Sequence, residues 1–74
     1  MKTYITITFN SEGSSPSEVK TILMNLGFKA AKGNYDFIYE WTKKDIKIEE
    51  LVWFADKIHA SLKNHNILFS IQTI

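Results

Sequence analysis

The spacing of apolar residues switches between a period of two and a helical period along the chain. This order restricts the fold more than any other feature of the sequence. Residues 2–9 alternate between two faces and are rich in β-branched side chains, which predicts a half-buried strand. A Ser-Pro-Ser-Glu start at residues 15–18, followed by apolar residues at helical spacing, predicts a capped helix that ends at Gly27.

The rest of the chain predicts a hairpin, a second helix and a last strand. Residues 28–32 and 35–42 read as two strands joined by a tight turn at Gly33-Asn34. Asp45 is the expected N-cap of the second helix, and residues 67–74 are the expected last strand. The apolar stripe of the second helix is expected to contain Ile48, Leu51, Val52, Ala55, Ile58 and Leu62.

The element order is therefore β-α-β-β-α-β in one α+β domain that spans residues 1–74. Right-handed crossovers in the two βαβ halves predict a ferredoxin-like split sandwich with strand order 4-1-3-2. In this fold a four-stranded antiparallel sheet carries both helices on one face. The side chains expected on the core face of the third strand are Tyr35, Phe37, Tyr39 and Trp41, and those expected on the open face are Asp36, Ile38 and Glu40.

Composition excludes several kinds of chemistry. The chain has no cysteine, so disulfides, thiolate metal sites and thiol nucleophiles are absent. All nine basic residues are lysines, and arginine is the usual group for bidentate recognition of phosphate. The longest apolar run is residues 51–55, far short of a membrane span, and no signal peptide is recognised. We therefore expect a cytoplasmic, non-catalytic protein without a cofactor or a metal.

The element order and one run of residues carry a family resemblance. The run Leu26-Gly-Phe-Lys-Ala-Ala-Lys-Gly-Asn-Tyr-Asp-Phe-Ile-Tyr-Glu-Trp41, with Ala55-Asp-Lys-Ile-His59 after it, resembles small uncharacterised archaeal proteins with a ferredoxin-like fold. The resemblance covers the whole chain and implies a fold, but it implies no activity. Metal chaperones and acylphosphatases of this fold depend on cysteine or arginine, which this sequence lacks.

The leading functional hypothesis is a binding or protein-interaction module that self-associates. Tyr4, Ile38 and Leu68 are expected on the uncovered face of the sheet. Trp53 lies off the predicted buried stripe, and tryptophan is enriched at interface hot spots. Lys57, one helical turn further on, is placed to cover the Trp53 ring. We expect a homodimer, with the sheet face favoured over the Trp53 face, while a different protein partner remains open.

Two further hypotheses use other residues. The loop residues Ser11, Gly13, Ser14 and Ser15 precede a helix N-terminus, where a small anionic ligand could bind, as in ACT-type sensor domains. The lysines that could contact nucleic acid beside the aromatic third strand are Lys29, Lys32, Lys43 and Lys44. Acidic residues in that strand make nucleic acid the less favoured partner. His59, expected beside the core, and His65, expected at a helix end, do not have the spacing of a metal pair.

Overall fold

The computed structural model describes residues 1–33 and 35–74. Its elements are β1 (Lys2–Thr8), α1 (Pro16–Asn25), β2 (Lys29–Ala30), β3 (Phe37–Glu40), α2 (Ile48–Leu62) and β4 (Leu68–Thr73). Gly33 has the positive φ expected of the hairpin turn, whereas the Asn34 half of that predicted turn lies outside the described residues. In the part of the chain that the structure describes, neither helix has the length and apolar content needed to cross a membrane.

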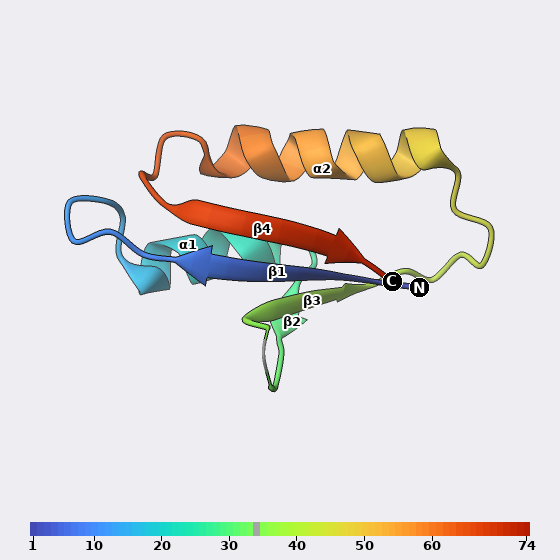
Figure 1. Cartoon of the computed structure of the whole chain (residues 1–74), viewed down its shortest axis with the longest axis horizontal. Helices are drawn as coiled ribbons and strands as arrows, with labels where there is room; N and C mark the ends of the chain where they lie inside the picture. The colour runs from blue at the N-terminus through green and yellow to red at the C-terminus, as the bar shows by residue number, and fades with distance from the viewer. Residues whose placement is uncertain (34) are drawn as a thin grey trace.

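The four strands form one antiparallel sheet in the order β2-β3-β1-β4 (Figure 1). This α+β architecture and strand order confirm the prediction from the sequence. β1 lies in the centre of the sheet, where Tyr4 is opposite Ile38 of β3 and Gln72 of β4. β2 is shorter than the predicted strand of residues 28–32, and β3 is shorter than the predicted strand of residues 35–42.

The start of α1 follows the sequence prediction closely. Ser15 is the N-cap, and its hydroxyl accepts a hydrogen bond from the Glu18 amide at 3.3 Å. The Glu18 carboxylate accepts in return from the Ser15 amide at 3.4 Å, which completes the capping box. Gly27 has φ +101°, and a Cβ atom there would lie 2.9 Å from the ring of Tyr39. Glycine at this position therefore allows both the chain reversal and the close approach of the aromatic ring.

The start of α2 differs from the prediction. The helix begins at Ile48 with Lys47 as its N-cap, and that residue makes no side-chain capping hydrogen bond. The prediction that Asp45 caps the helix is therefore wrong. Asp45 lies two residues before Lys47, outside the position where a side chain can reach the first free amides.

The buried stripe of α2 is rotated from the one expected. Phe54, Ile58 and Leu62 are buried, whereas Ile48 and Val52 are exposed. The inclusion of Ile48 and Val52 in the core, and the omission of Phe54, are therefore wrong. Apolar residues occupy most of the circumference at the start of this helix, so periodicity alone does not fix which side turns inward.

Aromatic packing selects the inward side of α2. The Phe54 ring lies 5.7 Å from the ring of Phe28, 4.5 Å from that of Tyr39 and 5.2 Å from that of Trp41, measured between ring centroids. These partners come from β3 and from the residues that flank it and β2. Burying Phe54 among them removes more apolar surface from water than burying Val52 would.

A single hydrophobic core fixes both helices to one face of the sheet. Its buried members are Ile5, Ile7, Val19, Leu23, Phe28, Phe54, Ile58 and Leu62. The β1 members share the face of Thr3, so α1 and α2 both cover that face, as expected. Phe37, Tyr39 and Trp41 pack against the same core, which confirms their predicted orientation.

Tyr35 is an exception to the predicted alternation. Its ring lies 4.4 Å from that of Tyr4, and its hydroxyl donates a hydrogen bond to Gln72 at 3.2 Å. Both partners are on the face away from the helices, so the placement of Tyr35 on the core face is wrong. β3 begins only at Phe37, so the strand alternation does not extend back to Tyr35.

Candidate functional site

The sheet face opposite the helices is one candidate binding surface, which we call the open sheet face. It consists of Lys2, Tyr4, Thr6, Thr8, Lys29, Ile38, Glu40, Leu68, Ser70 and Gln72. Strand register aligns four of these residues in a row across the sheet, in the order Lys29, Ile38, Tyr4 and Gln72. Directly opposed side chains in such a row are close enough to contact one another.

The pair that Tyr4 of this row forms with Tyr35, which precedes β3, was not predicted from the sequence. The Tyr35 ring tilts by 30° against Tyr4, and both side chains are half-buried. Ile38, opposite Tyr4, is also half-buried, so the side chains at the centre of the open sheet face partly cover one another. Leu68, on the edge strand β4, is 75 % exposed, the largest exposed fraction among the predicted interface residues.

Two of the four lysines considered for nucleic acid are paired with carboxylates. The Lys29 ammonium lies 3.5 Å from Glu40, and that of Lys43 lies 2.7 Å from Glu50. The hydrogen bond from Lys43 lowers the pKa of the Glu50 carboxyl below its usual range. Lys32 and Lys44 are exposed, on the hairpin and in the β3–α2 connection.

The serine-rich loop before α1 is occupied by contacts to the loop between α2 and β4. The Ser14 amide donates to the carbonyl of His65 at 3.0 Å, and the Ser14 hydroxyl shares a 2.6 Å hydrogen bond with His65 Nδ1. Gly13 lies so close to this loop that a Cβ atom would be 2.6 Å from the carbonyl oxygen of Asn66. Ser15 caps α1 and Ser14 bonds to His65, so both residues already have protein partners, whereas Ser11 is exposed.

The position of His65 explains its contact with Ser14. It lies just beyond the C-terminus of α2, in a turn that is closed by a hydrogen bond from the His65 amide to the Leu62 carbonyl at 3.1 Å. Sequence spacing gave no signal of the contact because the two residues are 51 positions apart. His59 is exposed on α2, so its expected position beside the core is wrong.

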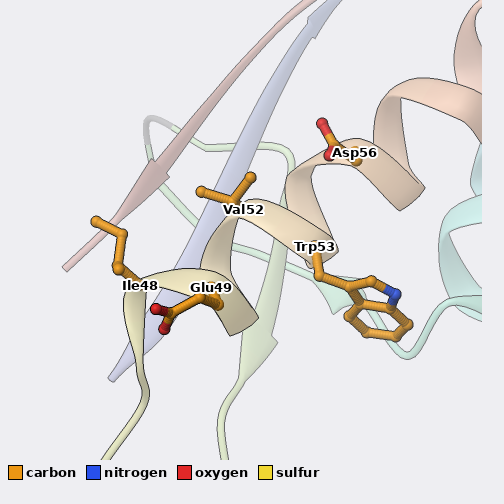
Figure 2. A pocket seen from close by; sticks show the side chains of 5 residues that line it. All are labelled: Ile48, Glu49, Val52, Trp53 and Asp56. Atoms are coloured by element: carbon orange, nitrogen blue, oxygen red, sulfur yellow. The ribbon is translucent and has the colours of Figure 1, made fainter.

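The outer face of α2 carries the second candidate surface. Trp53 is 61 % exposed, as the sequence predicted, and Lys57 Nζ lies 4.9 Å from the centre of its ring. A shallow hollow of about 380 Å³ lies beside the tryptophan (Figure 2). We call it the α2 hollow, and its lining residues are Ile48, Glu49, Val52, Trp53 and Asp56.

Among residues 1–33 and 35–74, no group of three or more His, Asp or Glu side chains is placed to hold a metal ion. The fold therefore defines a small α+β domain with a four-stranded antiparallel sheet and two exposed surfaces. No protein-family model, characterised protein or solved structure matches the chain in comparisons with known proteins.

Proposed function

We propose that this chain is a ferredoxin-like, non-catalytic interaction module that self-associates through the open sheet face. The observation that carries the proposal is the one-sided coverage of the sheet (Figure 1). Both helices pack on the face of Ile5, and no described element covers the opposite face. On that face the Tyr4–Tyr35 pair and Ile38 are half-buried, and Leu68 is exposed to solvent.

The chemistry of the open sheet face suits a second copy of the same chain. Its central row is apolar or uncharged apart from Lys29, which is already paired with Glu40. Two copies related by a two-fold axis bring such a surface against itself, so no separate complementary partner is required. Threonine, serine and glutamine at the margins can exchange hydrogen bonds across the contact.

The size of this surface predicts a weak dimer. Four strands about 4.8 Å apart, the longest of seven residues, give a face roughly 15 Å by 24 Å at most. Such a face lies at or below the lower end of specific protein interfaces. We therefore expect a dissociation constant in the micromolar range or above.

Sedimentation equilibrium tests the proposal with substitutions of two apolar residues on the open sheet face, Leu68 and Ile38. The wild-type protein should change from monomer to dimer as its concentration rises, and its melting temperature should rise in parallel. Leu68→Lys and Ile38→Lys should each abolish dimerisation, because each would bury an unpaired ammonium group. Leu68→Lys is the safer variant because its side chain is mostly exposed and contributes little to the fold.

Trp53→Lys is the matched control, since it replaces another exposed apolar side chain on a different surface. It should leave dimerisation unchanged. A wild-type protein that stays monomeric up to about 1 mM would overturn self-association. Dissociation by Trp53→Lys alone would move the interface to α2 and refute the assignment to the sheet.

A further inference from the structure

We propose that the α2 hollow is a docking site for a short basic amphipathic helix of a partner protein. This inference is independent of the open sheet face, because it rests on different residues on the opposite layer of the molecule. The helix we infer carries apolar side chains in its middle and a lysine or arginine at each end of the contact.

The apolar part of the α2 hollow is unusually exposed. Ile48 is 71 %, Val52 53 % and Trp53 61 % exposed, although all three lie within two turns of one helix. Single exposed apolar residues are ordinary on protein surfaces, whereas a contiguous group beside a hollow is typical of binding sites. The core does not use these residues because Phe54 fills the inward side of α2.

The hollow has two apolar walls with two carboxylates between them. In Figure 2, Ile48 and Val52 lie to one side of the helix and the Trp53 ring lies to the other. Glu49 and Asp56 stand at successive points along the helix between these walls. They are seven residues apart, which corresponds to two helical turns and a rise of about 10.5 Å.

The two carboxylates determine the charge of the partner. Neither Glu49 nor Asp56 forms an ion pair with any residue that the structure describes. Lys57 follows Asp56 directly, and its ammonium group lies over the Trp53 ring, while Lys47 is the N-cap residue two positions before Glu49. An apolar partner without cations would cover two unpaired carboxylates, and an acidic partner would repel them. A partner with two cations about two turns apart pairs with both while its apolar side chains enter the hollow.

The same charges argue against a second copy of α2 as the occupant. Two copies of this surface would bring four carboxylates against only two cations, the Lys57 ammonium groups that already lie over the tryptophan rings, and an excess of like charge at an interface is destabilising. Nucleic acids and anionic lipid surfaces are repelled for the same reason. A basic helix packed alongside α2 avoids these costs and matches its two-turn spacing.

The test uses a synthetic helical peptide with lysines at positions i and i+7 and leucines at i+3 and i+4 between them. Binding to the wild-type protein is followed by ¹H–¹⁵N NMR, in which each tryptophan gives its own indole N–H signal. The Trp53 signal, assigned with Trp53→Phe, should shift and saturate as the peptide is added. The Trp41 signal should stay fixed, because its indole N–H donates to Thr3 inside the fold at 2.8 Å.

Two charge-matched comparisons decide the outcome. A peptide with glutamates in place of the lysines should not bind, and Glu49→Lys combined with Asp56→Lys should weaken the lysine peptide by at least about tenfold. Glu12→Lys, on an exposed loop, makes the same charge change as Glu49→Lys alone and is its matched control; it should leave binding within about twofold of the wild type, whereas Glu49→Lys should weaken binding beyond that.

Several results would refute the inference. Equal shifts with the lysine and glutamate peptides would mean that charge does not select the partner. An unmoved Trp53 signal would mean that the hollow is not the site. A Trp53 signal that shifts with protein concentration alone would assign the hollow to a second copy. Failure of dimerisation through the open sheet face would not affect these outcomes, because a monomer also presents the α2 hollow.

Discussion

Phe54 is the residue whose replacement should most damage this domain. Its side chain is 5 % exposed and contacts three other aromatic rings, those of Phe28, Tyr39 and Trp41. The cluster connects α2 to the hairpin side of the sheet. Phe54→Ala would remove most of an aromatic side chain from the middle of this cluster and leave a cavity that the flanking backbone cannot readily close.

The expected loss is large relative to the stability of so small a protein. Burial of an aromatic side chain removes about 150–250 Å² from water, and at about 25 cal/mol per Å² this contributes about 4–6 kcal/mol. Measured phenylalanine-to-alanine substitutions in cores cost about 3–5 kcal/mol. A domain of 74 residues has a free energy of unfolding of about 4–11 kcal/mol. Phe54→Ala should therefore remove between about a quarter and all of this free energy of unfolding.

Urea denaturation followed by circular dichroism measures this effect. Phe54→Leu is a milder variant that should remain folded, and it should lower the free energy of unfolding by about 1–2 kcal/mol. Phe9→Ala is the matched control, because Phe9 is 40 % exposed and outside the buried core cluster; its cost should be about 1 kcal/mol or less. A Phe54→Ala protein as stable as Phe9→Ala would refute the inward rotation of α2 and its aromatic cluster.

Two smaller predictions concern polar contacts. Ser15→Ala removes the α1 cap and should lower the free energy of unfolding by about 1 kcal/mol in urea denaturation, and Ser15→Asp should restore most of it; no loss would mean that the capping box does not contribute. Lys43→Ala should raise the pKa of the Glu50 carboxyl toward its ordinary value in an NMR titration. Because folding lowers this pKa, the Lys43–Glu50 pair stabilises the protein fully at pH values above the ordinary pKa of a glutamate. This stabilisation is lost as the pH falls through the lower pKa of the folded state. An unchanged Glu50 titration in Lys43→Ala would contradict the ion pair as its cause.

Much of the fold was predictable because its signals are local. The capping box at Ser15 and Glu18 is a contact between residues three positions apart, so the sequence contains all of its parts. The alternation in β1 likewise placed Tyr4 on the face away from the helices without knowledge of any neighbour. The candidate interface residues Trp53 and Leu68 were recognised for the same reason, since each breaks or opposes a local apolar pattern.

The errors arose where several solutions were locally equivalent. The first half of α2 contains Ile48, Val52, Trp53 and Phe54, so more than one helix face satisfies an apolar period. Tyr35 stands before the first residue of β3, where alternation no longer applies. The α2 hollow was missed as a consequence, because Ile48 and Val52, which form one of its walls, had been assigned to the core.

The sequence by itself determined the order of helices and strands, the cap of α1, the inward face of β1 and the absence of thiol chemistry. These follow from the spacing and identity of residues that are close in the chain. Only the tertiary structure decided which side of α2 faces inward, because that depends on where Phe28, Tyr39 and Trp41 place their rings. It also joined Ser14 to His65 across 51 residues of chain. Contacts of this kind depend on burial summed over the whole core, which no local pattern contains.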